Sequence, residues 1–222
     1  MDSVEKMRTD WNDRAKRGFM QYTSGTETGS EADYDAAAKR DAGTVLLYLG
    51  SADTSAWTAL DVGCGVGRIM KELAPRMREV HGVDVSDEMI RLSAERLAGL
   101  PNVRLHRIDG TDLKLFADKT FDVMWSYSVF YHIPRVYYYA YLRELSRVMK
   151  PGGLLIYQLA QLYSWRRRFN ALFRIEPDPN DFNIRRFYTQ GHLRALAKEN
   201  GFEVLSIEPG PGHDLWCHWR KT

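Results

Sequence analysis

The sequence has few cysteines and no long hydrophobic run. Its 222 residues include two cysteines, Cys64 and Cys217, and neither a CxxC pair nor a metal-ligand spacing accompanies them, which argues against a disulfide framework and a zinc site. No run of about 18 apolar residues is present, so no membrane-spanning helix is expected. The charged segment 1–19 has no apolar core of the kind that a signal peptide carries. These absences favour a cytoplasmic protein with no metal centre and no membrane association.

A large excess of positive charge is also missing. The formal net charge is +2, which is too small to predict general nucleic-acid binding, although a local basic patch is compatible with it. Apolar residues make up 44% of the chain and charged residues 27%, as is typical of a globular protein. The length suits one domain with a sizeable core. We therefore expect a single domain over residues 1–222.

Predicted strands and helices alternate through the middle of the chain. Short apolar runs predict strands within 57–63, 79–86, 102–109, 121–128 and 151–160, and amphipathic segments predict helices at 68–77, 87–100 and 135–150. Two helices, 4–15 and 34–49, flank a Gly/Ser/Thr-rich loop at the start, and a helix at 189–201 precedes a hairpin at 202–219. This order predicts a doubly wound α/β/α sandwich whose parallel sheet finishes with antiparallel pairing.

Three glycines stand at alternate positions between the first predicted strand and its helix. Gly63, Gly65 and Gly67 lie in "LDVGCGVGR", and glycines there let the backbone turn sharply and approach a ligand closely. Asp84 ends the next strand about twenty residues later, where an acid can accept hydrogen bonds from both hydroxyls of a ribose. Loop and acid together indicate a cofactor of the adenosine type.

The glycine spacing decides against a nicotinamide dinucleotide. That fingerprint is G-x-G-x-x-G, and its third glycine, counted from Gly63, would fall at position 68. Arg68 occupies that position, and the glycine comes one residue earlier. The spacing G-x-G-x-G therefore calls for another adenosine cofactor.

Five motifs in order resemble the class I S-adenosylmethionine-dependent methyltransferases, and the resemblance covers the chain from about Trp11 to the C-terminus. They are "LDVGCGVGR" (60–68), "GVDVSDEMI" (82–90), "RIDGTDL" (107–113), "FDVMWSYSVFYHI" (121–133) and "VMKPGGLLIY" (148–157). The resemblance implies a Rossmann-like, seven-stranded, mostly parallel sheet with an antiparallel last strand, and S-adenosyl-L-methionine as the methyl donor. It also implies that residues 1–50 form an N-terminal helical cap and that 162–188 is a substrate-side lid.

Roles for individual residues follow from the same resemblance. The methionyl part of the cofactor would be lined by the carboxylate of Asp61 and the backbone of Gly63, Cys64 and Gly65, and Ser126 would face its amino end. Asp84 would hold the ribose, and the adenine would be held by Val85, Met89, Asp109 and Gly110. Trp11 or Tyr22 would close over the cofactor, and Arg14 would meet the methionyl carboxylate.

The acceptor side is less determined by the sequence. His132 follows the fourth strand, where an imidazole can deprotonate a hydroxyl near neutral pH, and a structural histidine fits the same position. The arginines of 162–188 favour an acidic or phosphorylated small molecule, but the pattern also fits a solvated amphipathic helix followed by a loop. A tRNA methyltransferase of the wobble-uridine type and a non-catalytic cofactor-binding protein are the alternatives. The acceptor atom, oxygen or nitrogen, and the oligomeric state stay open.

Overall fold

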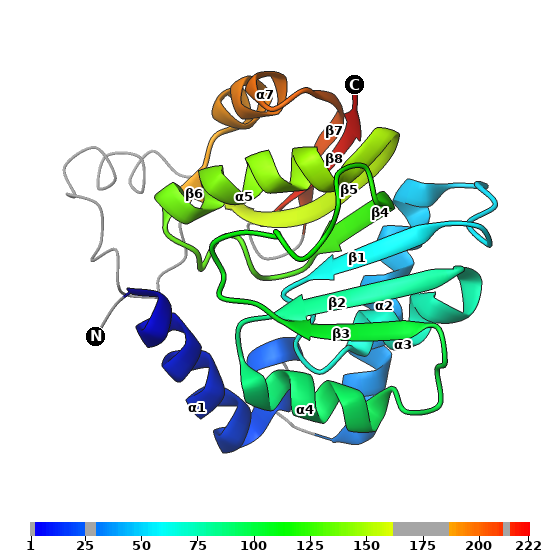
Figure 1. The fold of residues 1–222 in the computed structure, drawn as a ribbon, viewed down its shortest axis with the longest axis vertical. Helices are drawn as coiled ribbons and strands as arrows, with labels where there is room; N and C mark the ends of the chain where they lie inside the picture. The colour runs from blue at the N-terminus through cyan, green and yellow to red at the C-terminus, as the bar shows by residue number, and fades with distance from the viewer. Residues whose placement is uncertain (1–2, 25–29, 162–186, 211–213) are drawn as a thin grey trace.

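The computed structural model describes residues 3–24, 30–161, 187–210 and 214–222, and these form a three-layer α/β/α sandwich (Figure 1). The strands are β1 (Thr58–Val62), β2 (Glu79–Asp84), β3 (Val103–Arg107), β4 (Phe121–Ser126), β5 (Met149–Gln161), β6 (Phe187–Tyr188), β7 (Phe202–Gly210) and β8 (Asp214–Lys221). The helices are α1 (Ser3–Ser24), α2 (Glu31–Leu49), α3 (Arg68–Leu73), α4 (Asp87–Arg96), α5 (Arg135–Val148) and α7 (Gln190–Glu199), with a 3₁₀ turn at Ala74–Arg76.

The strand order along the sheet is β3-β2-β1-β4-β5-β8-β7, and the short β6 pairs with β5 off this path. The pairings among β1 to β5 are parallel, whereas β8 runs antiparallel to both β5 and β7. The chain order reverses at β1, whose neighbours are β2 and β4. In such sheets the carboxyl ends of the strands at the reversal form a crevice that holds ligands. The expected seven-stranded sheet with an antiparallel last strand is confirmed.

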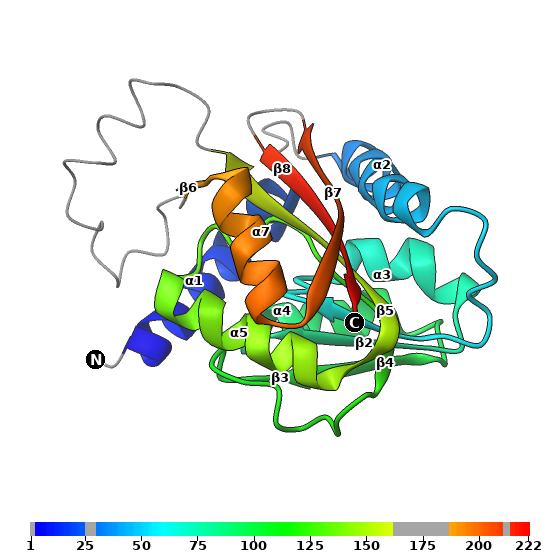
Figure 2. The same cartoon turned by 90° about the horizontal axis from the view of Figure 1, so that it is seen from above.

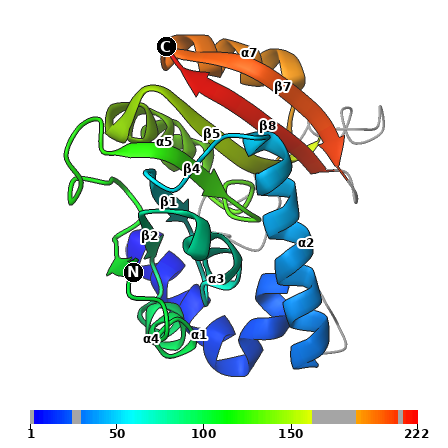
Figure 3. The same ribbon diagram turned by 90° about the vertical axis from the view of Figure 1, so that its right-hand side faces the viewer.

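Helices cover both faces of the sheet, with α5 and α7 on one face and α2 and α3 on the other (Figures 2 and 3). Side chains alternate between the two faces along each strand. Leu60, Met124 and Leu155 join the core under α5, while their neighbours Ala59, Val123 and Ile156 join the core under α2 and α3. Because both faces are covered, β1 is buried at every position.

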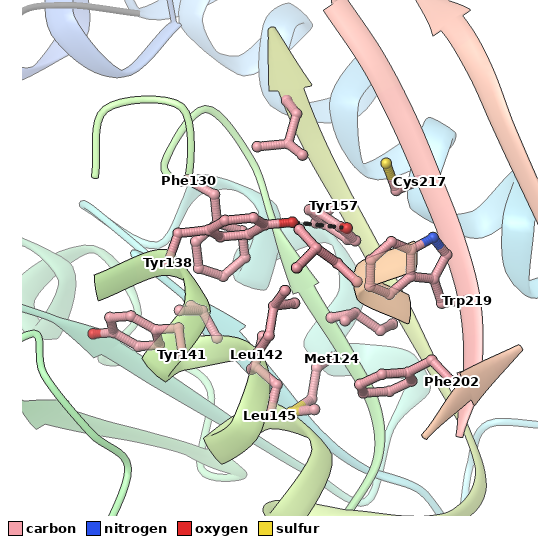
Figure 4. Packing of buried hydrophobic residues seen from close by; sticks show 14 of the residues in the cluster. Met124, Phe130, Tyr138, Tyr141, Leu142, Leu145, Tyr157, Phe202, Cys217 and Trp219 are labelled. Carbon is pink, nitrogen blue, oxygen red and sulfur yellow. Dashed lines mark hydrogen bonds between the residues drawn. The ribbon is translucent and has the colours of Figure 1, made fainter. Parts of the chain in front are cut away.

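Large aromatic side chains fill the core under α5 (Figure 4). The hydroxyls of Tyr138 and Tyr157 lie 3.1 Å apart, and the Tyr157 ring meets Trp219 edge to face. From the sequence we expect Tyr137 and Tyr141 to pack one face of this helix. Tyr141 is buried as expected, and Tyr137 is half-buried and packs against the same core. Tyr138 is buried as well, because its hydroxyl meets that of Tyr157 on β5 and its ring meets those of Phe130 and Tyr188.

The N-terminal helix differs from the expected one. Helix α1 continues past Ala15 to Ser24, with a kink at Gly18, whose φ of 147° is outside the helical range. Its middle is fixed to the start of α4, because the side-chain oxygen of Asn12 accepts hydrogen bonds from the Ser86 hydroxyl (2.6 Å) and the Glu88 backbone N–H (3.2 Å). These contacts hold α1 across the ligand-binding end of the sheet.

Two further differences concern the fifth strand and its neighbour. Strand β5 begins at Met149, which pairs with Phe121 before the register shifts, so the expected Pro-Gly turn is an irregularity within the strand. Strand β6 has no counterpart among the predicted elements. The expected substrate-side lid, 162–188, lies outside the described residues apart from Phe187 and Tyr188.

Candidate cofactor and acceptor site

A cavity opens at the carboxyl ends of β1, β2 and β4. It has about 930 Å³ of empty space, part of which is open to solvent. The glycine loop, the end of β2, the segment after β4, and helices α1 and α2 all contribute to its wall. The wall residues named at the sequence level are Asp61, Gly63, Cys64, Gly65, Asp84, Val85, Met89, His132 and Trp11.

The glycine loop is shaped by close packing as well as by its turn. Gly63 has a φ of 75°, and a Cβ at this position would lie 2.3 Å from the Cγ2 atom of Val129. The backbone N–H groups of Gly63 and Cys64 both donate to the carbonyl of Val83, at 2.8 and 3.0 Å. A side chain at position 63 would therefore meet the segment after β4 and strain the backbone.

Asp84 organises the same loop from the next strand. Its Oδ2 atom accepts a hydrogen bond from the Gly65 N–H, and its Oδ1 atom accepts one from the Ser86 N–H, both at 2.9 Å. Burial raises the pKa of this carboxyl, and the backbone N–H donors counter part of that effect. The Ser86 hydroxyl caps α4 by accepting from the Met89 N–H. Asp84 thus positions the glycine loop and still lines the cavity.

Two further groups in the wall have raised pKa values. Burial raises the pKa of Asp61 to about 7, and the Trp125 side chain and the charge of Arg68 act in the opposite direction. Burial also raises the pKa of the Cys64 thiol well above its usual range, and the nearby carboxylates add to this. A thiol held in its protonated form is a poor nucleophile, so Cys64 serves as a small wall residue.

The segment after β4 forms the other side of the cavity. His132 is half-buried there, and its ring meets that of Trp11 edge to face, with centroids 5.6 Å apart. Ser128 has a φ of 59°, and its hydroxyl donates to the Oε1 atom of Gln158. A non-glycine residue in this backbone region stores strain, which is common at functional sites. The imidazole therefore stands at the cavity beside an N-terminal aromatic ring.

Three of the expected residues are absent from the cavity lining. Ser126 is buried away from the cavity, and its hydroxyl donates to the carbonyl of Val62 at 2.8 Å, because the alternation along β4 turns this side chain into the sheet. The Asp109 side chain is 69% exposed and pairs with Arg107. Gly110 packs against α1, where a Cβ would lie 2.3 Å from the Cε atom of Met7.

The two remaining N-terminal candidates are Arg14 and Tyr22. The guanidinium of Arg14 lies over the ring of Trp11, 4.4 Å from its centroid, and Arg14 is absent from the cavity wall. Tyr22 belongs to α1, and its side chain lies outside the described part of the chain.

The cavity also contains residues to which the sequence assigned no role in the site. They are Met7, Tyr34, Val62, Val66, Arg68, Ile69, Val83, Ile108, Tyr127, Ser128, Val129, Ile133 and Tyr141. The position of 127–129 directly after a parallel strand is a signal that could have found those three. Tyr34 and Tyr141 come from α2 and α5, and no local motif marks them. Only the packing of the helices brings them to the site.

Metal binding and membrane insertion find no support in the described ranges. Within them, no group of three or more His, Cys, Asp and Glu side chains is placed to hold a metal ion. No helix among the described residues has both the length and the apolar character that a membrane span requires.

Comparison with known sequences identifies the central part of the chain. Residues 59–153 match the model of a methyltransferase domain. A demethylmenaquinone methyltransferase from Staphylococcus aureus is 35% identical over 102 residues, which are 44% of this chain and 41% of that enzyme. The match thus spans about two fifths of the length of this relative.

Comparison with solved structures extends over nearly the whole chain. Magnesium protoporphyrin IX methyltransferase from Synechocystis, with bound S-adenosylhomocysteine, has a TM-score of 0.72 and 17% identity, and the match covers 100% of both chains. Phosphoethanolamine N-methyltransferase 1 from Haemonchus contortus has a TM-score of 0.76 and 14% identity over 98% of this chain and 48% of that one. These structures share the fold. Residues 59–153 are therefore similar to a methyltransferase domain, and the chain shares the fold of these two methyltransferases.

Proposed function

We propose that this protein transfers a methyl group from S-adenosyl-L-methionine to an oxygen or nitrogen atom of a small-molecule acceptor. The observation that carries the proposal is the cavity at the reversal of strand order, where the glycine loop and Asp84 meet. The methyltransferase-domain match over 59–153 supports it.

The residues of the cavity fit this cofactor. Gly63 leaves the loop without a side chain where the backbone approaches the cavity. We assign the ribose hydroxyls to the carboxylate of Asp84, an acceptor-only group, and the apolar face of the adenine to Val85 and Met89. The carboxyl of Asp61 would bind the amino group of the methionyl part of the cofactor. A bound S-adenosylmethionine supplies an electrophilic methyl group on a sulfonium.

The task of the chain in such a reaction is to orient the partners and exclude water. Orientation of two reactants contributes up to about 7–11 kcal/mol in favourable cases. The N-terminal helical cap provides Met7 and Trp11 over the cavity, and α2 provides Tyr34. If the acceptor is a hydroxyl, a base has to remove its proton, and we assign that role to His132, which lines the cavity beside Trp11.

Similar proteins support a small-molecule acceptor. The names of two structural neighbours and of the S. aureus relative specify a magnesium protoporphyrin, phosphoethanolamine and demethylmenaquinone. These acceptors differ widely from one another, so we propose the class of acceptor and leave its identity to experiment.

Turnover with a panel of acceptors tests the proposal. Purified protein is incubated with methyl-labelled S-adenosylmethionine and with phenols, carboxylates, amines and phosphorylated amines, and S-adenosylhomocysteine formation is measured. We expect at least one acceptor to raise product formation far above the rate without acceptor, and the Asp84→Ala variant to lose that increase. A chain that binds the cofactor but transfers no methyl group to any acceptor would support a non-catalytic binding protein. A chain that binds no cofactor would contradict the proposal.

A further inference from the structure

Arg68 is a buried cation in the wall of the cavity. It is the residue that occupies the third glycine position of a dinucleotide loop, and it begins α3 directly after the glycine loop. Only 6% of its surface is exposed, yet it belongs to the cavity lining. Arg68 therefore borders the space that the ligand would fill.

Neighbouring groups compensate the charge of Arg68. Its Nη1 atom pairs with a carboxylate oxygen of Asp41 on α2, a residue that is itself 3% exposed. The guanidinium also lies over the ring of Tyr127, 4.7 Å from its centroid. A buried charge is costly unless it is paired, so these contacts account for an arginine at this position. They also fix the direction of the guanidinium.

The cavity wall thus presents charges of both signs near each other. Asp61 lines the same cavity as Arg68, and the charge of Arg68 lowers the pKa of the Asp61 carboxyl against the larger effect of burial. An acid and a guanidinium in one wall are complementary to a zwitterionic ligand group. The amino-acid end of S-adenosylmethionine is such a group.

The geometry points to Arg68 as the residue that binds the carboxylate of this amino-acid end, with Asp41 as the positioning residue that holds it. The assignment rests on the proposed function. A guanidinium has five donors in a planar fork, so a pair with Asp41 and a contact with a ligand carboxylate are compatible. Arg68 thereby replaces Arg14, which stacks on Trp11 outside the cavity lining.

Two ligands that differ at the amino-acid end test the assignment. S-adenosylhomocysteine carries the carboxylate, and 5′-methylthioadenosine lacks the whole amino-acid end but keeps the adenosine. Dissociation constants of both are measured by calorimetry for the wild type, Arg68→Gln and Arg14→Gln. We expect Arg68→Gln to weaken S-adenosylhomocysteine by about 10- to 100-fold, the range for one lost charge-assisted hydrogen bond. Its affinity for 5′-methylthioadenosine should stay within about twofold, and Arg14→Gln should leave the ratio of the two constants unchanged.

Other outcomes separate this assignment from the proposed function. If Arg68→Gln lowers the affinity for both ligands equally, Arg68 only supports the fold. If Arg14→Gln, and not Arg68→Gln, removes the preference for S-adenosylhomocysteine over 5′-methylthioadenosine, Arg14 binds the carboxylate. Either result overturns the proposal. A wild type that binds both ligands equally overturns this assignment alone, whereas a wild type that binds neither overturns the proposed function with it.

A second variant covers the case in which Arg68→Gln fails to fold because Asp41 is left buried without its cation. Arg68→Gln combined with Asp41→Asn removes both charges, and the same loss of preference is expected from it. The single variant Asp41→Asn keeps the guanidinium but frees its direction. We expect a smaller loss for S-adenosylhomocysteine, and an undiminished preference would overturn the positioning role of Asp41.

Discussion

Binding of S-adenosylmethionine should weaken as the pH falls through 7, because the Asp61 carboxyl has to be ionised to hold a cationic amino group. Burial raises the pKa of this carboxyl to about 7 in the protein without ligand. A protonated Asp61 offers no charge to the ligand. The apparent affinity therefore follows the ionised fraction and loses about tenfold for each pH unit well below the pKa.

The magnitude follows from the same number. With a pKa of about 7, the ionised fraction falls about tenfold between pH 8 and pH 6, which corresponds to about 1.4 kcal/mol of binding free energy. Calorimetry at pH 6, 7 and 8 measures the dissociation constant. Repeating it in two buffers of different ionisation enthalpy counts the protons released on binding, which should approach one at pH 6 and zero at pH 8.

A variant isolates the contribution of Asp61 from that of Asp84, whose pKa is also raised by burial. Asp61→Asn should bind the cofactor weakly and lose most of the pH dependence between 6 and 8. Equal wild-type dissociation constants at pH 6 and pH 8, with the fold intact by circular dichroism, would refute the reasoning about this carboxyl.

Three further predictions follow from single side chains. Asp84→Ala removes the acceptor proposed for the ribose and should weaken cofactor binding by at least about tenfold, while the exposed neighbour variant Asp87→Ala should bind normally; unchanged affinity in Asp84→Ala would reject the ribose assignment. His132→Ala should lower turnover of a hydroxyl acceptor by about 10²- to 10⁴-fold with cofactor affinity within about threefold, and full activity would return His132 to a structural role. Burial lowers the pKa values of His81 and His106 in the folded protein. The neutral histidines therefore add to the free energy of unfolding above their unfolded-state pKa, and this contribution is lost as the pH falls through the folded-state pKa values. The urea midpoint should therefore drop between pH 7 and pH 5, and by less in His106→Gln; an equal drop in both proteins would contradict this.

The core of the site was predictable because its chemistry is concentrated in local motifs. The glycine loop and Asp84 sit at strand ends that the apolar runs already indicate, and in a parallel sheet those ends meet at one edge. The order of the strands therefore brings them together without further information. The hydrogen bond from Gly65 to Asp84 is the physical result.

The remaining positions depend on details that one sequence does not contain. Neighbouring residues of a strand point to opposite faces of the sheet, so the direction of the Ser126 side chain depends on the exact register of β4. In the structure its hydroxyl donates to the carbonyl of Val62. The burial of Tyr138 on α5 depends on partners elsewhere in the chain, namely Tyr157, Phe130 and Tyr188. The placement of α1 depends on the contacts of Asn12 with the start of α4, far away in the sequence.

Direct titration of the purified protein with S-adenosylhomocysteine tests the central claim most directly. We expect saturable binding of one molecule per chain that stabilises the protein against heat, and strong weakening of that binding in Asp84→Ala. A folded wild-type protein that binds nothing at millimolar ligand would contradict the proposed cofactor site.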